Sequence, residues 1–557
     1  MKLYTLILIL ISILLTPFAA DAQVEPVRSD HPVYGFLERM EVKQVLPRYH
    51  GTVIPVSRDR IAGYLAQLQE NRRQLTNTER QLLDSYRIEF AYDLNYAGAN
   101  TTQLFGRNGL SKTFSGMPSH KQRYLYAYAD TSRTTFFMNG FFSTEHRSRS
   151  LSGTFDGSDA YSLSIVDFGG TVRGTISDRL GYLVEVRNAY GGGDRELARE
   201  IPRLWHSRDY RGDWEDFAEF SRASVRYQAG IVGIELSRDR LQWRESHGES
   251  LFLSGNAPMF NALRIDVSYG AVNYNYVHGA VLWHNYRQRE DQKYFVANRF
   301  EFSVMQNRLS IGINQSTMYA RSSPEIGYLI PFNILEATER NLGDRDASMI
   351  GGDITVRPVR NFEIKSGAYF DDIRLDESFT TSRRNMWSIH AGFYYADILG
   401  WRDTGLRVNY TRIEPHVYSH AREANLHYEH DGFLMGHPLG PNSDEWHAML
   451  EYRPAWQWLV SVEYLRQRHG DNVIDEGGNV IRNVGGDVFF PHRRDIDPET
   501  KQFLDGILTE RHTMRLHIRY EIFRQFVVGI RAEWSDISRE EQSWQHVTLS
   551  GGIWLGM

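Results

Sequence analysis

The 557-residue sequence predicts an all-β transmembrane barrel of antiparallel strands, preceded by a small α-helical bundle. Three observations predict this fold class: strands in which apolar and polar side chains alternate, the recurrence of such strands, and an N-terminal export signal. The clearest strand covers residues 514–522, where every second residue is apolar and each intervening one is polar or charged. Because successive side chains of a strand point to opposite faces, this strand separates an apolar environment from a polar one.

The same alternation recurs along most of the chain. Residues 526–534, 446–452, 294–302 and 182–187 show it, and we count about twenty candidate strands of about ten residues each, some of which can be short strands in loops. A soluble sandwich can contain one such strand but does not repeat it to this extent. Lipid offers no hydrogen-bond partners, so only a closed barrel leaves no strand edge unpaired. We therefore expect an outer-membrane barrel with a polar lumen.

Residues 1–22 have the composition of a secretory signal peptide. Lys2 precedes a mostly apolar run at residues 3–15, and small residues follow at Ala20 and Ala22. A membrane-anchor helix is the alternative, but it needs ~20 apolar residues and this run is shorter. We expect cleavage after Ala22 and export of the remaining chain across the inner membrane.

The composition limits both chemistry and partners. The chain has no cysteine, which excludes a lipid-modified cysteine, a disulfide bond and a thiolate metal site. Its net charge of −6 lacks the basic excess of nucleic-acid-binding proteins, so we expect no nucleic acid as a partner. The 31 Tyr, 29 Phe and 12 Trp can form aromatic girdles at the two membrane interfaces.

Helical periodicity marks the region before the first barrel strand. Apolar residues recur at helical spacing in residues 33–40 and 61–68, and Thr76 with Glu79 matches a capping box. We expect a periplasmic helical domain at residues 23–86 and the barrel at residues 87–557. The helical domain either caps the barrel floor or offers a docking surface to periplasmic partners.

Short and long connections alternate after Tyr86. Outer-membrane barrels have short periplasmic turns and long outer loops, so this alternation predicts the orientation of the barrel. The short turns expected to face the periplasm lie near residues 130–133, 177–179, 270, 306–308, 358–361, 454–457 and 523–525. The long loops expected to face outward or to fold into the lumen lie near residues 98–120, 145–160, 191–218, 239–260, 320–346, 415–442 and 469–508.

Several motifs occur in an order that resembles the Wzi family of capsule assembly proteins. They include His31–Tyr34 (HPVY), Arg238–Trp243 (RDRLQW), Leu253–Pro258 (LSGNAP), Pro324–Pro331 (PEIGYLIP) and Gly436–Ser443 (GHPLGPNS). The resemblance implies a barrel of about eighteen strands with a periplasmic helical bundle, acting as a lectin that holds capsular polysaccharide at the cell surface. One departure is the final residue, Met557, because many outer-membrane barrels end on an aromatic residue.

Sugar binding requires flat aromatic faces beside hydrogen-bonding groups, because a pyranose has an apolar face and a rim of hydroxyls. Loop 191–218 fits this requirement best, and loop 239–260 is the second candidate. The polysaccharide-binding residues expected in these loops are Trp205, Tyr210, Asp213, Trp214, Trp243 and Glu249. The alternative is that these aromatic side chains only pack the loops against the barrel rim.

The polar faces of strands 514–522 and 526–534 support an alternative function. Their mixed charges either line a selective pore or pair with one another and close the lumen. The residues expected to line the lumen are Arg515, His517, Arg519, Glu521, Arg531 and Glu533. A barrel of this width conducts unless loops or side chains plug it.

Catalytic and metal-binding motifs are missing from the sequence. It has no Gly-x-Ser-x-Gly elbow, no His-Glu-x-x-His and no phosphate-binding loop, so we expect neither an enzyme nor a cofactor. A loop cluster of Asp344, Asp346, Asp371 and Asp372 offers oxygen ligands suited to calcium. Loop carboxylates more often lie in solvent or pair with arginine, so we expect no metal site.

We therefore expect a monomeric barrel in the outer membrane of a Gram-negative bacterium. It binds a surface polysaccharide, capsular or other, and leaves the polymer chemically unchanged. Its further partners are outer-membrane lipids and the barrel-assembly machinery. A passive porin-like channel for small polar solutes is the alternative function, and an open lumen would favour it.

Overall fold

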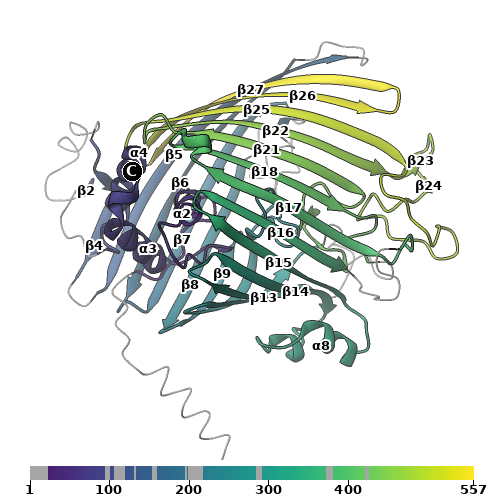
Figure 1. Ribbon diagram of the computed structural model, residues 1–557, viewed down its shortest axis with the longest axis horizontal. Helices are drawn as coiled ribbons and strands as arrows, with labels where there is room; N and C mark the ends of the chain where they lie inside the picture. Colours follow the sequence, from purple (N-terminus) through teal and green to yellow (C-terminus); the bar gives the residue numbers. More distant parts are fainter. Residues whose placement is uncertain are drawn as a thin grey trace, which may run out of the picture.

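The computed structural model describes residues 23–94, 101–105, 119–130, 133–153, 160–194, 197–198, 217–283, 292–371, 380–420 and 426–556. Within these residues eighteen antiparallel strands form one closed barrel (Figure 1). The strands are β5 (Thr135–Gly153), β6 (Ala160–Ile176), β7 (Leu180–Gly193), β8 (Phe217–Ala229), β9 (Val232–Asp239), β11 (Phe260–Tyr269), β12 (Val272–Val281), β13 (Gln292–Val304), β14 (Leu309–Arg321), β15 (Ala347–Val359), β16 (Phe362–Asp371), β17 (Met386–Ala396), β18 (Thr404–Ile413), β21 (Ser443–Tyr452), β22 (Trp458–Asp471), β25 (Ile507–Phe523), β26 (Phe526–Arg539) and β27 (Gln542–Gly556). The last strand closes the barrel on the first, with Val547 opposite Ser150.

Short strands outside the wall explain why the sequence-based count of about twenty strands is two too high. The strand β4 (Tyr126–Ala129) pairs only with the beginning of β5, and β2 (Thr101–Gln103) pairs in parallel with β3 (Gln122–Tyr124). Further two-stranded pairs join β1 (Val53–Ile54) to β10 (Gln242–Trp243), β19 (Glu429–His430) to β20 (Phe433–Leu434) and β23 (Val473–Ile474) to β24 (Val480–Arg482). The number eighteen agrees with the family resemblance.

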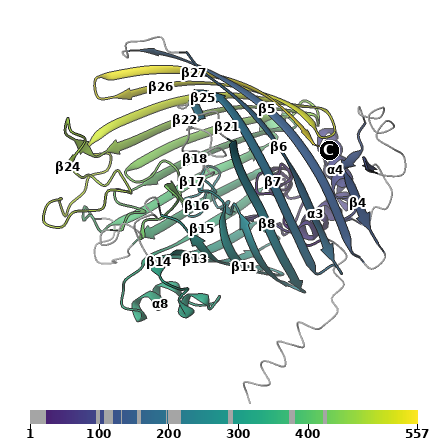
Figure 2. The same cartoon turned by 180° about the vertical axis from the view of Figure 1, so that it is seen from behind.

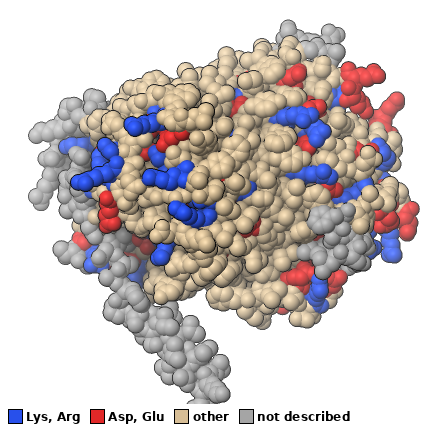
Figure 3. All heavy atoms as spheres, viewed as in Figure 1, with Lys and Arg blue, Asp and Glu red and all other residues tan. Residues whose placement is uncertain are grey.

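The alternation read from the sequence corresponds to the two faces of the wall. On β25 and β26 the apolar side chains of Met514 and Ile530 are exposed on the outside. The side chain of Arg515 points to the other face, where its Nε donates to Glu533 Oε2 at 2.7 Å. Figure 3 shows the outside of the wall as a largely uncharged surface, with acidic side chains gathered toward the loop end. The predicted barrel is confirmed, and on β25 and β26 its exterior is apolar and its inner face polar.

Three helices lie at the end of the barrel that carries the short turns and the C-terminus (Figure 1). They are α2 (Val33–Val42), α3 (Arg58–Glu70) and α4 (Asn77–Glu89), accompanied by a short 3₁₀ turn, η1 (Arg72–Gln74). Thr76 and Glu79 form the predicted capping box at the start of α4. A shared apolar core that includes Leu37, Leu65 and Leu83 holds the helices together.

Hydrogen bonds join this helical part to the short turns. The Asn361 N–H donates to Val42 O at 3.0 Å, and Asn307 Nδ2 donates to Glu41 Oε1 at 3.0 Å. Arg524 Nη1 donates to Ser85 Oγ at 2.8 Å. The helical part is therefore fixed to the barrel floor, while the boundary expected between residues 86 and 87 remains a prediction.

Two of the long loops fold into the barrel from the other end. A buried apolar cluster joins Phe252 and Tyr418 of these loops to Phe295 and Tyr369, which point inward from β13 and β16. The Tyr418 hydroxyl donates to Leu251 O at 2.6 Å, and the Tyr428 hydroxyl donates to Phe252 O at 2.8 Å. This cluster, here called the lumen core, fills the part of the barrel bounded by β11 to β18.

The remaining elements are short. A 3₁₀ turn, η3 (Ile326–Leu329), and the helix α8 (Leu335–Asn341) follow β14, and η4 (Ile398–Gly400) lies between β17 and β18. Figure 2 shows α8 beyond the strands, outside the barrel. No helix within the described ranges is long and apolar enough to cross a membrane.

Candidate functional site

A groove of about 570 Å³ lies at the loop end of the barrel. Its walls come from segments far apart in the sequence: the turn after β10, the β19–β20 hairpin, the β23–β24 hairpin and the end of β26. The apolar lining residues are Phe433, Leu434, Pro438, Leu439, Pro441, Ile474, Val480, Val488 and Phe489. The polar lining residues are Asn256, His469, Asp471, Asn472, Asp487 and Arg539.

Asn442 holds one wall of this groove in place. Its buried side chain donates from Nδ2 to Gly470 O at 2.8 Å and to Asp505 O at 3.0 Å, and its Oδ1 accepts the Leu504 N–H at 2.7 Å. Its φ of 55° is left-handed, a conformation that asparagine tolerates better than most residues. One side chain thus fastens the segment Gly436–Ser443 both to the end of β22 and to the loop before β25.

The polar groups of the groove surround its apolar floor. Arg539 Nη2 lies 3.4 Å from Asp471 Oδ2, and His469 Nε2 lies 2.8 Å from Gly486 O. Asn472 Oδ1 accepts the Val484 N–H at 2.9 Å, whereas Asn472 Nδ2 is buried without a hydrogen-bond partner among the described residues. Buried polar atoms normally have partners, so this amide, whose residue lines the groove, is the donor that we test for a ligand contact. Asp487 is exposed and offers a second carboxylate.

The predicted sugar-binding residues fall into three groups. Trp205, Tyr210, Asp213 and Trp214 lie outside the described residues. Trp243 is fully buried in the lumen core and stacks on Phe252 with ring centroids 4.7 Å apart. No face of its indole ring is free for a sugar, so its assignment as a sugar contact is replaced by a packing role.

Glu249 is exposed, but the groups around it belong to the inner wall of the barrel. The charged groups that act on it include Glu445 of β21 and Glu463 of β22, which point inward. It therefore faces the lumen, and it is not among the residues that line the groove. None of the groove residues was predicted from the sequence, although the motif Gly436–Ser443 marks one of its walls.

The expected lumen-lining charges face inward from β25 and β26. Arg515 bridges Glu533 at 2.7 Å and Glu463 at 3.1 Å, and Arg531 lies 3.5 Å from Glu533. Arg531 retains contact with water, with 45% of its side chain exposed. Half-buried residues of the same face are His517, Arg519 and Glu521. Ion pairs therefore link three neighbouring strands on this side of the lumen.

Two of the loop aspartates considered as calcium ligands, Asp346 and Asp371, are not brought together. Asp346 accepts Arg321 Nη2 and the Tyr328 hydroxyl, both at 2.8 Å, on the outside of the wall. Asp371 accepts the Tyr418 N–H at 2.7 Å in the lumen core. Asp372 lies outside the described residues. Asp346 and Asp371 therefore lie on opposite sides of the barrel wall and cannot share one ion.

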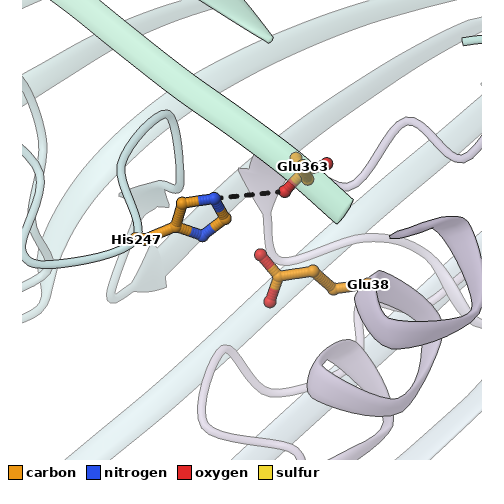
Figure 4. Close-up of side chains that lie close together, drawn as sticks. All are labelled: Glu38, His247 and Glu363. Atoms are coloured by element: carbon orange, nitrogen blue, oxygen red, sulfur yellow. Dashed lines mark ion pairs between the residues drawn. The ribbon is translucent and has the colours of Figure 1, made fainter. Parts of the chain in front are cut away.

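A second buried cluster joins the helical part to the wall. Figure 4 shows Glu38 of α2, His247 of the inward loop and Glu363 of β16 around one point, with His247 Nε2 3.4 Å from Glu363 Oε1. Burial and the neighbouring Lys365 hold the pKa of His247 well below its usual value, so the ring is neutral.

Positively charged side chains already lie beside the carboxylates of Glu38 and Glu363. Lys365 Nζ lies 3.2 Å from Glu38 and 3.8 Å from Glu363, and Arg244 lies 2.8 Å from Glu38. Although burial alone would raise the pKa of Glu38, Arg244 and Lys365 hold it well below its usual range. The cluster has the ligand types for a metal ion, but its charges are balanced by side chains, and its evident role is to fasten helix, loop and wall together.

These features define a class of protein: an outer-membrane β-barrel with a helical floor, a partly filled lumen and a polar groove at its loop end. The family model described as capsule assembly protein Wzi matches residues 144–546. The chain belongs to this family, which confirms the resemblance read from its loop motifs and the expected location in the outer membrane.

A solved structure of a capsule assembly protein shows the same fold. The outer-membrane protein Wzi of Escherichia coli, described as a carbohydrate-binding β-barrel involved in group 1 capsule assembly, has a TM-score of 0.55 and 12% identity, covering 95% of this chain and 99% of that one. The Pseudomonas aeruginosa proteins OccK1 and OprD have TM-scores of 0.40 and 0.39 and identities of 8% and 11%. Each covers 75% of this chain, with 99% and 94% of its own length matched. A search of curated protein sequences finds no match.

Proposed function

We propose that this barrel binds a surface polysaccharide at its loop end and keeps it at the cell surface without changing it chemically. The observation that carries the proposal is the groove, in which an unpaired buried amide, Asn472 Nδ2, lies among apolar and charged side chains. Membership of the capsule assembly family and the carbohydrate binding of the Escherichia coli protein support the same function.

The groove has the size and chemistry that a sugar chain needs. Its volume lies within the ~300–1,000 Å³ of typical ligand sites. Phe433 and Phe489 supply apolar contact, while Asp487 and Asn472 supply an acceptor and a donor for hydroxyls. One open groove gives weak binding, but a polymer that meets many barrels at once gains avidity. Trp205 and Trp214 in loop 191–218 remain candidates for additional contacts.

The test uses one isosteric substitution and a matched control. In Asn472→Asp the unpaired donor becomes a carboxylate oxygen, whereas Oδ1 can still accept the Val484 N–H. Asn479→Asp exchanges the same groups on the exposed β23–β24 turn outside the groove, where Asn479 Nδ2 donates to Asp475 Oδ2 at 3.1 Å. A deletion strain of the native host is complemented with each variant, and polymer shed into the medium is measured.

We expect wild type and Asn479→Asp to retain the polysaccharide, while Asn472→Asp sheds it. The lost hydrogen bond and the added charge predict about a tenfold weaker site, corresponding to roughly 1–2 kcal/mol. If the polysaccharide is retained both in the deletion strain and in the strain that carries Asn472→Asp, the proposed function is wrong.

A passive channel is the second candidate. The exposed inward charges near Arg531 favour it, because they keep a polar and hydrated surface in the lumen. The lumen core and the helical floor favour the polysaccharide-binding function, since they leave less of the cross-section for solutes. Current across a planar bilayer separates the two: a steady open-pore current without polysaccharide binding supports the channel.

We propose a monomer that contacts outer-membrane lipids with its apolar wall and that is inserted by the barrel-assembly machinery.

A further inference from the structure

The segment between β14 and β15 folds back along the outside of the barrel. Residues 322–346, here called the outer strap, contain η3 and α8, and Figures 1 and 2 both show α8 beyond the strand wall. Asp346, at the end of the strap, closes its base, because it accepts Arg321 Nη2 from the last residue of β14 and the Tyr328 hydroxyl from the strap. The outer strap is therefore a closed loop held against the wall.

A row of polar side chains lies on the wall beneath the strap. Tyr276 of β12 is opposite Asn298 of β13, and Asn298 is opposite Gln315 of β14. These three share a face with Phe300 and Ile313, whose exposed side chains mark the outside of the barrel. Polar groups on the outside are unusual for a membrane barrel, because lipid offers them no hydrogen bonds.

The outer strap supplies the missing partners. The Tyr276 hydroxyl donates to Tyr328 O at 2.7 Å, and Asn298 Nδ2 donates to Asn333 O at 3.2 Å. Gln315 Oε1 accepts the Leu335 N–H at 2.9 Å. Each member of the row is bonded to the strap's backbone, so the strap covers polar groups that would otherwise face outward.

The position of the row along the strands places it at membrane depth. Gln315 is the sixth residue after Leu309, where β14 leaves its short turn. With a rise of about 3.3 Å per residue and a tilt of about 40°, it lies roughly 15 Å above the turn. The apolar band of such barrels is about 25 Å tall, so the row falls inside the band.

The part of the strap before α8 exposes apolar side chains away from the barrel, whereas α8 carries charged ones, with 66% of the Arg340 side chain exposed. Ile326 is 75% exposed, Phe332 is 71% exposed and Ile334 is 60% exposed. The opposite surface of the strap is apolar as well, since Tyr328 and Leu335 are buried against Tyr294 and Tyr319 of the wall. A loop in water does not present clustered apolar side chains in this way, whereas a loop in lipid does.

We propose that the part of the outer strap before α8 is embedded in the outer leaflet, with Ile326, Phe332 and Ile334 against lipid acyl chains. It seals the polar row on β12 to β14 from lipid and adds an apolar surface beside the barrel wall. The occupant of its exposed surface is the hydrocarbon of the bilayer, not a second protein.

The absence of cysteine from the chain allows a direct test. Three single-cysteine variants of the full chain carry an environment-sensitive fluorophore: Phe332→Cys on the strap, Ile311→Cys on the lipid-facing wall and Ile481→Cys on the exposed β24. Each is placed in phosphatidylcholine vesicles and quenched either with acyl-chain nitroxide lipid or with aqueous iodide. Heat-modifiable gel migration confirms that each barrel is folded.

We expect the label at residue 332 to behave like the label at residue 311, with strong quenching by the nitroxide lipid and at least a fivefold lower iodide quenching than the label at residue 481. Iodide quenching equal to that at residue 481 would place the strap in water and overturn the proposal. Protection from both quenchers would overturn it too, because a protein surface would then cover the strap.

Discussion

Substitution of Asn442 by alanine should loosen the groove wall without touching the groove lining. The change removes three side-chain hydrogen bonds, to Gly470 O, Asp505 O and the Leu504 N–H. At about 0.5–1.5 kcal/mol each, and with a further cost for alanine in a left-handed conformation, the loss is roughly 3 kcal/mol. Opening of the wall should then become roughly a hundredfold more frequent.

Amide hydrogen exchange measures this opening. The Gly470 N–H is the informative probe, because it donates to the backbone O of residue 442 at 3.0 Å, a bond that alanine can keep. We expect its exchange to accelerate roughly a hundredfold in Asn442→Ala. Asn479→Ala, on an exposed turn of the neighbouring hairpin, should leave it unchanged. Equal protection of Gly470 in the two variants would refute the idea that Asn442 fastens the wall.

Two further predictions follow from other parts of the barrel. Phe252→Ala should destabilise the lumen core by about 3–5 kcal/mol and raise the bilayer current, and an unchanged current would show that this cluster does not close the lumen. Arg515→Met should remove the cation that bridges Glu463 and Glu533, each of which keeps a further partner, His447 and Arg531 respectively, and lower barrel stability by about 1–3 kcal/mol. Arg515→Lys should cost less, and urea unfolding midpoints measure both.

Alternation was sufficient to predict the wall, because a barrel strand at membrane depth has two contrasting environments. Residues 514–522 and 526–534 form parts of β25 and β26 with the expected faces. The pattern also placed Asn298 on the apolar face of residues 294–302, and that placement is correct. What alternation cannot predict is that a strap from a later loop covers this amide, since the covering contact depends on how the loop folds.

The groove illustrates the same limit for the functional site. Its lining combines residues as distant as Asn256, Phe433, Asn472 and Arg539, which meet only after the barrel has closed. Trp243 was predicted to bind sugar because it is aromatic and lies in a loop, but its ring stacks on Phe252 and is buried. An unpaired buried donor is visible only in three dimensions, because composition does not reveal which amides find partners.

The most direct test of the central claim is the binding of surface polysaccharide from the native host to the purified full-length barrel, measured at equilibrium in detergent. Wild type and Asn479→Asp should bind with equal affinity, and Asn472→Asp should bind about tenfold more weakly. Equal binding by all three proteins would place the polysaccharide elsewhere on the barrel, and no binding by wild type would contradict the account.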